Sequence, residues 1–358
     1  MALIYAVFIL LLYRYGVSAL EHSVRVFYYN TVVKKMVTDK QLLKQSDHFN
    51  LGIYRPELPY HFDNVYTIQK KLGVRIQTIS FYQAWGEGEE HQFKTRVVNN
   101  LSRGGFVPFI TWEPWLAAFS EYKGQMPDSS LAIISRGNFD SYIRAWARKA
   151  TKFGKPLFVR PLHEMTNDVY PWSSAYKNSP EMFIECWKHI VGIFREEGAE
   201  NVAFVWTPYK PSDTTFYPGN QWVDWIGLDI FNYGPLSENG MWIDFFTLTR
   251  SYYDAVKGYD KPIIIAEVGT VEQGGNKNDW YRDMFRTLGT RTFPLVEGLI
   301  VFDTPVSKAP NGLTVDLSMT SDEAIYSVID NRVLVDSLNV KQINTAAHDN
   351  NDHRPGNQ

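Results

Sequence analysis

Short apolar segments recur along the chain, and longer amphipathic segments separate them. The apolar segments are rich in β-branched and aromatic residues, which is typical of buried strands. They cover residues 51–54, 76–82, 106–112, 157–162, 202–207, 223–231, 263–266 and 299–302. Between them, apolar residues recur at spacings of three and four, for example over 139–152 and 182–197, which predicts helices. Alternating strands and helices predict an α/β fold, either an open doubly wound sheet or a closed barrel.

The residues between these segments are typical of those that end a helix before the next strand in parallel βα units. Gly-Lys-Pro at 154–156, Gly198 and Asp-Lys-Pro at 260–262 each stand where a helix should stop before a strand begins. No Gly-x-Gly-x-x-Gly follows the first strand, which removes the simplest dinucleotide-binding version of the open sheet. Eight strand segments in one chain favour a single (β/α)8 TIM barrel.

The ends of the chain differ from this regular middle. Residues 1–19 contain an apolar run of signal-peptide length followed by small residues, so we expect a signal peptide or an uncleaved signal anchor; a strand of the fold is the alternative. We expect residues 20–48 to be a lead-in segment, 49–340 the catalytic barrel and 341–358 a disordered tail. The predicted location is secreted, extracellular or periplasmic, with a membrane-anchored form facing outward as the alternative.

Composition narrows the choice of partner. A formal net charge of -3 gives no reason to expect nucleic acid, and we expect membrane contact only through the N-terminal run. The chain has 11 Trp, 21 Tyr and 22 Phe, whose faces suit sugar rings, so we expect a polysaccharide or oligosaccharide substrate and a monomeric protein. Cys186 is the only cysteine; its apolar surroundings indicate a buried structural thiol.

Two glutamates close predicted strands. Glu164 follows the fourth apolar segment and Glu267 the seventh, and these strands face each other across the mouth of an eight-stranded barrel. Paired carboxyl groups over a cleft suit hydrolysis of a glycosidic bond, because one can protonate the leaving oxygen while the other attacks the anomeric carbon or activates water. The alternative for each is an ordinary salt-bridged residue at a strand end.

Other polar and aromatic side chains occur at the same strand ends. Arg160 lies two steps along the alternation from Leu162, so it could point into the barrel and hold a carboxylate ionised; a structural ion pair is the alternative. Indoles at strand ends could stack on sugars or fill the core, and polar groups could bind sugar hydroxyls or cap loops. These candidate substrate-binding residues are His163, Trp112, Trp115, Trp206, Asp229, Asn232 and Tyr233.

No metal or cofactor is indicated. No His-Glu-x-x-His motif occurs, and His163 and Glu164 are adjacent rather than one helical turn apart. A Gly-x-Ser-x-Gly nucleophile elbow is also absent, which weakens an α/β-hydrolase interpretation. Hydrolysis by carboxyl groups remains.

Several ordered motifs resemble those of glycoside hydrolase family 26, over roughly residues 51–336. They are Arg-Pro-Leu-His-Glu-Met at 160–165 with Tyr-Pro-Trp at 170–172, Thr-Trp-Glu-Pro-Trp at 111–115, and Ala-Glu-Val-Gly at 266–269. The resemblance implies that Glu164 is the acid/base and Glu267 the nucleophile of a retaining enzyme. It also implies substrate contacts by Glu113, Tyr170 and Trp172, in a family of β-mannanases, mixed-linkage β-glucanases and β-1,3-xylanases.

The motifs also depart from the family. Where members commonly carry Asn-Gly-Asp-Trp after the Glu-Met pair, residues 166–169 read Thr-Asn-Asp-Val, and Phe231 stands where a tyrosine is frequent. The block around Tyr170 and the Ala-Glu-Val-Gly run resemble the glucanase branch slightly more than the mannanase branch. We therefore expect a retaining β-glycanase acting on mixed-linkage β-glucan or β-mannan. The alternatives are a non-catalytic carbohydrate-binding barrel and a membrane-tethered transglycosylase.

Overall fold

Eight parallel strands close into a barrel in the computed structural model, which describes residues 49–72 and 74–319. The strands are β1 (Asn50–Tyr54), β2 (Thr78–Ala84), β3 (Val107–Glu113), β4 (Leu157–Pro161), β5 (Val202–Trp206), β6 (Trp225–Asn232), β7 (Ile263–Thr270) and β8 (Val296–Phe302). Strand β1 pairs with both β2 and β8, which closes the sheet. The predicted (β/α)8 barrel is confirmed.

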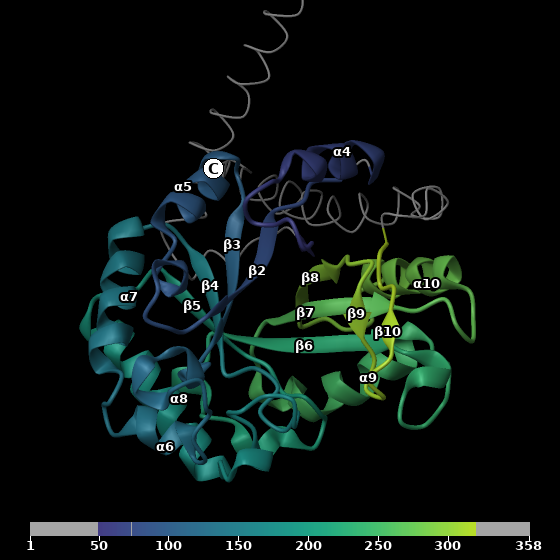
Figure 1. Ribbon diagram of the computed structural model, residues 1–358. Helices are drawn as coiled ribbons and strands as arrows, with labels where there is room; N and C mark the ends of the chain where they lie inside the picture. Colours follow the sequence, from purple (N-terminus) through teal and green to yellow (C-terminus); the bar gives the residue numbers. More distant parts are fainter. Residues whose placement is uncertain (1–48, 73, 320–358) are drawn as a thin grey trace, which may run out of the picture.

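The α-helices surround the strands on the outside (Figure 1). They are α4 (Asp63–Leu72), α5 (Thr95–Arg103), α6 (Ser130–Ser135), α7 (Asp140–Phe153), α8 (Pro180–Glu196), α9 (Phe245–Val256) and α10 (Lys277–Gly289). The connection from β5 to β6 has no α-helix and contains only two short 3-10 helices, η6 (Asp213–Phe216) and η7 (Asn220–Trp222). The barrel is therefore incomplete in its outer layer at this point.

Helix ends follow the local sequence. Helix α8 begins after Ser179, whose side chain accepts a hydrogen bond from the Met182 amide, and Pro180 takes the first helical position. Helix α7 ends at Gly154, which adopts a left-handed φ of 62° that other residues reach only at a cost. The two helices predicted over 139–152 and 182–197 are thus confirmed within two residues as α7 and α8.

The alternation of side chains along the strands separates two apolar layers. The barrel interior is filled by Val107, Phe109, Phe158, Ala203, Val205, Trp225, Ile264, Ala266 and Ile300. A larger cluster lies between the strands and the helices, and it includes Cys186, a free and buried cysteine as predicted. Arg160 shares the inward phase of Phe158 on β4, so the alternation carries its side chain towards the barrel axis.

Strands β6 and β7 extend further than the sequence predicts. Strand β7 runs to Thr270 instead of ending at residue 266, so Glu267 lies within the strand. Asp229 of β6 is the register partner of Glu267, beside an irregularity in the pairing between Leu228 and Asp229. The longer pairing places two carboxylate side chains next to each other at the same end of the barrel.

A short hairpin follows β8. It consists of β9 (Ser307–Lys308) and β10 (Thr314–Val315), which pair antiparallel. Val315 and Leu317 pack with Val271 into a small buried cluster, against which Phe231 and Tyr233 rest. The hairpin therefore supports the wall formed by the end of β6.

The predicted signal segment (1–19), lead-in segment (20–48) and tail (341–358) lie outside the described residues, as does the end of the predicted barrel domain from residue 320. Over the part of the chain that is described, no helix has both the length and the apolar character needed to cross a membrane.

Candidate active site

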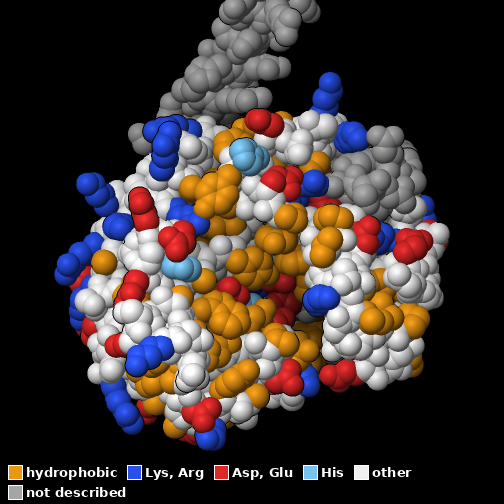
Figure 2. Space-filling view, in the orientation of Figure 1, with side chains coloured by type: hydrophobic (Ala, Val, Ile, Leu, Met, Phe, Trp, Pro, Cys, Tyr) orange, Lys and Arg blue, Asp and Glu red, His pale blue; other side chains and the backbone are white. Residues whose placement is uncertain are grey.

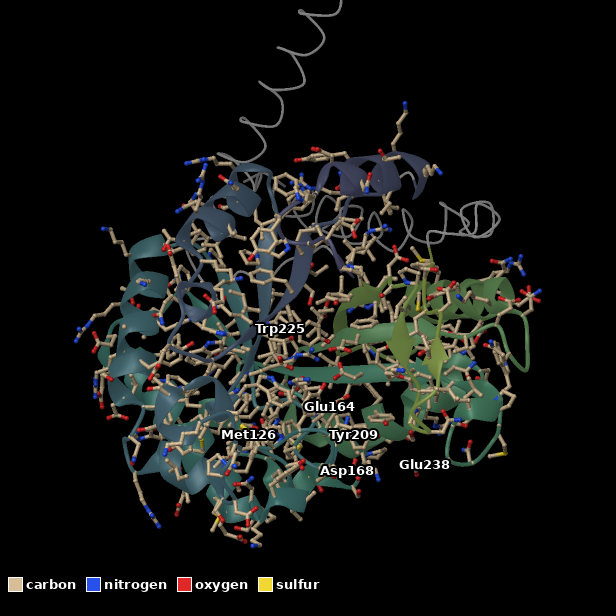
Figure 3. The ribbon with its side chains drawn as sticks, in the orientation of Figure 1. Met126, Glu164, Asp168, Tyr209, Trp225 and Glu238 are labelled. Atoms are coloured by element: carbon tan, nitrogen blue, oxygen red, sulfur yellow. The ribbon has the colours of Figure 1, made fainter. Side chains whose placement is uncertain are left out.

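Glu164 and Glu267 lie at the same end of the barrel. Glu164 follows the end of β4, and Glu267 is in the last half of β7. Their exposed fractions are 9% and 6%. Figure 2 shows a hollow on this face with acidic side chains at its floor and apolar side chains around it, and Figure 3 labels Glu164 near the middle of the same view. Both carboxyl groups are thus nearly buried where the barrel face is hollowed.

Arg160 pairs with two of the acidic residues, Asp229 and Glu267. Its side chain is fully buried, and Nη1 donates to both carboxylate oxygens of Asp229 at 2.9 and 3.0 Å while Nη2 donates to Oε1 of Glu267. The guanidinium also donates to Oγ1 of Thr111 at 3.0 and 2.8 Å. A buried guanidinium needs this many partners because its desolvation is costly. Arg160 therefore keeps a positive charge beside Glu267 and Asp229.

Both hydrogen bonds to the Glu267 carboxyl group are accepted by the same oxygen. The Tyr82 hydroxyl from β2 and the Arg160 guanidinium from β4 both donate to Oε1. None of the described residues donates a hydrogen bond to Oε2. Two donors, one of them cationic, fix the orientation of the carboxyl group. The other oxygen stays available as a nucleophile.

Glu164 is held differently. Leu162 and Glu164 have left-handed φ values of 53° and 52°, which cost energy for residues with a Cβ and turn the chain sharply after β4. The Glu164 amide donates to the Thr207 carbonyl at 3.0 Å, and Asn167 Nδ2 donates to Oε2 of Glu164 at 2.7 Å. These bonds keep the strained turn in place, with the carboxyl group facing Asp229.

Burial sets the protonation of Glu164 and Asp229. Desolvation is the largest cause that raises the pKa of Glu164, and the negative charge of Glu267 raises it further, while the Asn167 hydrogen bond lowers it. Desolvation also raises the pKa of Asp229 well above its ordinary range, against the opposing charge of Arg160. The hydrogen bond between the two carboxyl groups raises the pKa of Asp229 and lowers that of Glu164.

Glu113 and His163 form a second polar pair beside the first. Trp115 Nε1 donates to Oε2 of Glu113 at 3.1 Å, and burial raises the pKa of Glu113 to about 7. His163 Nε2 is 4.0 Å from Oε1 of Glu113, and neither ring nitrogen of this buried histidine has a hydrogen-bond partner among the described residues. Burial, followed by the charge of Arg160, lowers the pKa of His163 well below its ordinary range, so the ring is neutral.

Three predicted tryptophan contacts are wrong. Trp112 is fully buried and packs against Trp85 and Trp146 between the barrel and the helices, at ring-centroid distances of 4.4 and 4.7 Å. Trp206 is also fully buried on the outer face, edge-on to Tyr217. The alternation places both side chains one step out of phase with the inward-facing residues.

Trp172 is the third tryptophan that cannot stack on a substrate. Its exposed fraction is 0%, and its Nε1 donates to the His163 carbonyl at 2.7 Å, so it supports the loop after β4. Tyr170 stacks on it with ring centroids 4.6 Å apart. Tyr170 is half-buried, and the charges of Glu164 and Glu267 are among the causes that raise the pKa of its hydroxyl, so it lies among the acidic residues.

The residues predicted to contact the substrate at the end of β6 also fall into two groups, one that supports the fold and one that lies at the acidic end of the barrel. Asn232 is buried; its Oδ1 accepts from the amides of Gly234 and Ile243 at 3.3 and 3.2 Å, so it caps the loop and its prediction as a sugar contact is wrong. Tyr233 is half-buried, stacks on Phe231, and lies near enough to Glu164 for that charge to raise the pKa of its hydroxyl. Of these residues, Asp229 and Tyr233 belong to the acidic end of the barrel.

Four residues of this site were not predicted from the sequence. They are Tyr82, Thr111, Asn167 and Tyr209. Tyr82 and Thr111 lie inside predicted strands, on the phase that faces the barrel, so the alternation alone could have found them. Figure 3 shows Tyr209 between Glu164 and the pair Asp168 and Glu238, and burial with the charge of Glu164 raises its pKa to about 12. No local signal marks Asn167 and Tyr209, which lie in loops.

In the described segments 49–72 and 74–319, no group of three or more His, Cys, Asp or Glu side chains could hold a metal ion. The arrangement provides a carboxyl group at Glu164 whose pKa burial raises to about 7, an oriented carboxyl group at Glu267, and a buried cation that pairs with Glu267 and Asp229. These groups suit acid–base and nucleophilic catalysis at an acetal carbon.

Comparison with known proteins agrees with this chemistry. A family model described as glycosyl hydrolase family 26 matches residues 128–290, a range that contains both Glu164 and Glu267. Over this range the chain resembles glycoside hydrolase family 26. The matched range begins in the loop before α6 and ends one residue after α10, so it includes strands β4 to β7.

Two named relatives are similar to parts of the chain. The chain is 35% identical over 196 residues to Endoglucanase H from Acetivibrio thermocellus, covering 52% of this chain and 20% of the relative. It is 27% identical over 166 residues to a mannan endo-1,4-beta-mannosidase from Bacillus subtilis, covering 44% of this chain and 42% of the relative. The chain thus spans less than half the length of these two relatives.

Solved structures of family 26 proteins share the barrel. The GH26 domain of an endo-beta-mannanase/endo-beta-glucanase from Prevotella bryantii aligns with a TM-score of 0.55 at 15% identity, over 83% of this chain and 94% of that chain. A GH26 beta-mannanase from Bacteroides ovatus gives a TM-score of 0.55 at 15% identity, over 82% of this chain and 91% of that chain. At these identities the likeness concerns the fold.

Proposed function

We propose that this protein is a glycoside hydrolase of family 26, a retaining endo-β-glycanase with Glu164 as the acid/base and Glu267 as the nucleophile. The observation that carries the proposal is the unequal treatment of the two glutamates. Arg160 and Tyr82 orient Glu267 through one oxygen, whereas burial and the negative charge of Glu267 favour a protonated Glu164. Double displacement needs this division, because one carboxyl group must give a proton while the other attacks.

The proposed reaction has two steps. In the first, Glu164 gives its proton to the glycosidic oxygen, the bond from that oxygen to the anomeric carbon breaks, and Oε2 of Glu267 forms an ester with the carbon. In the second, the Glu164 carboxylate takes a proton from water, whose oxygen attacks the anomeric carbon. The electron pair of the ester bond returns to Glu267, and the sugar leaves with its original configuration.

The proposed substrate is a neutral β-linked polysaccharide, with mixed-linkage β-glucan ahead of β-mannan. Half-buried aromatic side chains around the acidic residues, namely Trp115, Tyr170, Tyr209 and Tyr233, suit the apolar faces of sugar rings. The relative matched at 35% identity is named an endoglucanase, and those matched at 27% to 29% include mannan endo-1,4-beta-mannosidases. We further propose that the protein acts outside the cell, on the strength of the apolar run in residues 1–19.

The decisive experiment compares wild-type protein with Glu267→Ala and Glu164→Ala on β-glucan, β-mannan and β-1,3-xylan. Glu267→Ala should abolish release of reducing ends, and Glu164→Ala should slow it by about 10²- to 10⁴-fold. The exposed Glu121→Ala is the matched control and should keep wild-type rates. Proton NMR of early products should show the β-anomer first; an α-anomer first would exclude retention.

Two other outcomes decide between the alternatives. A wild-type protein that binds oligosaccharides but releases no reducing ends on any of the three polymers would be a carbohydrate-binding barrel, and the enzymatic proposal would be lost. Longer oligosaccharide products in the presence of acceptor sugars, with few new reducing ends, would identify a transglycosylase instead of a hydrolase.

A further inference from the structure

Tyr82 is the second donor to Glu267, and it comes from a strand on the other side of the barrel. Tyr82 lies near the end of β2, and its hydroxyl donates to the same oxygen, Oε1, that the Arg160 guanidinium contacts. Arg160 already pairs with this carboxylate, so the hydroxyl is not needed to neutralise a buried charge. A second donor on the same atom must therefore act in another way.

Packing holds the Tyr82 ring in one orientation. Its ring is edge-on to Tyr54, with centroids 5.4 Å apart and planes at 89°, and Tyr54 stacks on Phe302 at 4.4 Å and 13°. The Arg160 guanidinium lies 6.0 Å from the Tyr82 ring centroid on another side. Rings fixed by neighbours on several sides lose little freedom when they form a hydrogen bond. The hydroxyl is thus preorganised towards Oε1.

We propose that Tyr82 is a positioning residue that acts through Glu267 and speeds the second half of the reaction, the release of the sugar from the nucleophile. The inference rests on the proposed function, because it needs a covalent glycosyl ester on Glu267. It concerns a residue outside the acid/base and nucleophile pair.

The direction of the effect follows from where charge develops. In the first step Glu267 loses negative charge as Oε2 attacks, so a donor on Oε1 stabilises the starting carboxylate more than the transition state. In the second step the C–Oε2 bond breaks and its electron pair returns to the carboxylate, so the same donor stabilises the transition state more than the ester. Tyr82 keeps its proton throughout, since burial and the charge of Glu267 raise the pKa of its hydroxyl well above the ordinary value.

The test is Tyr82→Phe, which removes the hydroxyl and keeps the ring. On a dinitrophenyl β-glycoside, whose leaving group makes the second step limiting, kcat should fall about 10- to 100-fold, the value of a hydrogen bond to a charged group. KM should fall by a similar factor, so kcat/KM should stay within about threefold of wild type. Acid-quenched samples should show a burst of dinitrophenol and protein that is heavier by one glycosyl unit.

Tyr142→Phe is the matched control. Tyr142 is buried outside the barrel, and its hydroxyl donates to the His91 carbonyl at 2.7 Å, so the same atom and a comparable bond are removed away from the acidic residues. The control should lose stability while keeping kcat and KM within about twofold of wild type on the same glycoside. Should Tyr82→Phe fold poorly, 3-fluorotyrosine at position 82 keeps the ring and offers a more acidic donor; its kcat should equal or exceed the wild-type value.

Other results would overturn the inference. A fall in kcat/KM with no burst and no glycosylated protein would place the role of Tyr82 in the first step. Wild-type kinetics in Tyr82→Phe, or a slower 3-fluorotyrosine enzyme, would remove any role for its hydroxyl. If wild-type protein itself turns over no glycoside in the same assay, the proposed function fails and the inference fails with it, which separates that result from the preceding ones.

Discussion

Arg160 shows why a single buried side chain can govern an entire site. It has no exposed surface, yet its guanidinium contacts Thr111, Asp229 and Glu267. A planar group with five N–H donors can satisfy three partners at fixed angles, which lysine cannot do. Its positive charge opposes the desolvation that raises the pKa of Asp229. The site therefore depends on this cation for stability and for orientation.

Arg160→Met should be destabilised by about 3–5 kcal/mol at pH 7, because it leaves two buried carboxylates without their counter-charge. The loss should shrink at pH 5, because burial raises the pKa of Asp229 and this carboxyl group takes up a proton, which removes its need for a counter-charge. Arg160→Lys should be intermediate in stability and about 10- to 100-fold slower, since the charge stays while hydrogen bonds are lost.

Urea unfolding at both pH values measures the first effect, and kcat measures the second. Arg148→Met is the control: Arg148 pairs with Glu197 at the surface with 66% of its side chain exposed, and its loss should change the free energy of unfolding by less than about 1 kcal/mol. An Arg160→Met protein as stable and active as wild type would refute the role assigned to this guanidinium.

Elements were easier to predict from the sequence than the direction of their side chains. The eight strands and helices α7 and α8 were predictable, because apolar runs and spacings of three and four are local signals. The inward or outward phase of a strand is set by its neighbours in the barrel, so Trp112 and Trp206 were assigned to the wrong face. The missing helix between β5 and β6 also has no clear local signal. Glu164 was easier, since a charged residue directly after a strand is visible in the sequence.

Trp112→Phe tests whether the Trp112 side chain on β3 points outward, towards the helices. Trp112 packs against Trp146 of α7 and Phe194 of α8, so its truncation should lower the free energy of unfolding by about 1–3 kcal/mol, less than the 3–5 kcal/mol of a full Trp→Ala change. KM should stay within about twofold of wild type. Trp115→Phe, at a half-exposed residue three positions along, should cost less stability and raise KM. A raised KM in Trp112→Phe, measured on oligosaccharides, would return this residue to the site.

Closure of the barrel links the chemistry to the stability of the whole molecule. Strands distant in sequence bring Glu113, Glu164, Asp229 and Glu267 around one guanidinium, and Arg160 can neutralise only part of that charge. Burial therefore raises the pKa of Glu113, Glu164 and Asp229, and the folded state binds protons that the unfolded chain releases. The free energy of unfolding should therefore decrease as the pH rises. The decrease should occur over the pH range in which Glu164, the proposed acid, must still hold its proton.

Glu113 gives this pH dependence its sharpest test. Its pKa is about 7 in the folded protein against an ordinary value of 4.5, so its contribution to stability is fully present below about pH 4.5 and is lost as the pH rises through 7. Glu113→Gln stays neutral, and Gln can still accept from Trp115. Relative to wild type it should gain up to about 3 kcal/mol between pH 4.5 and 8. Glu164 and Asp229 remain in both proteins, so the difference between their urea unfolding curves isolates Glu113. The exposed Glu121→Gln should give a flat difference, and an equally flat one for Glu113→Gln would show that this carboxyl group is ionised in the folded state at pH 5.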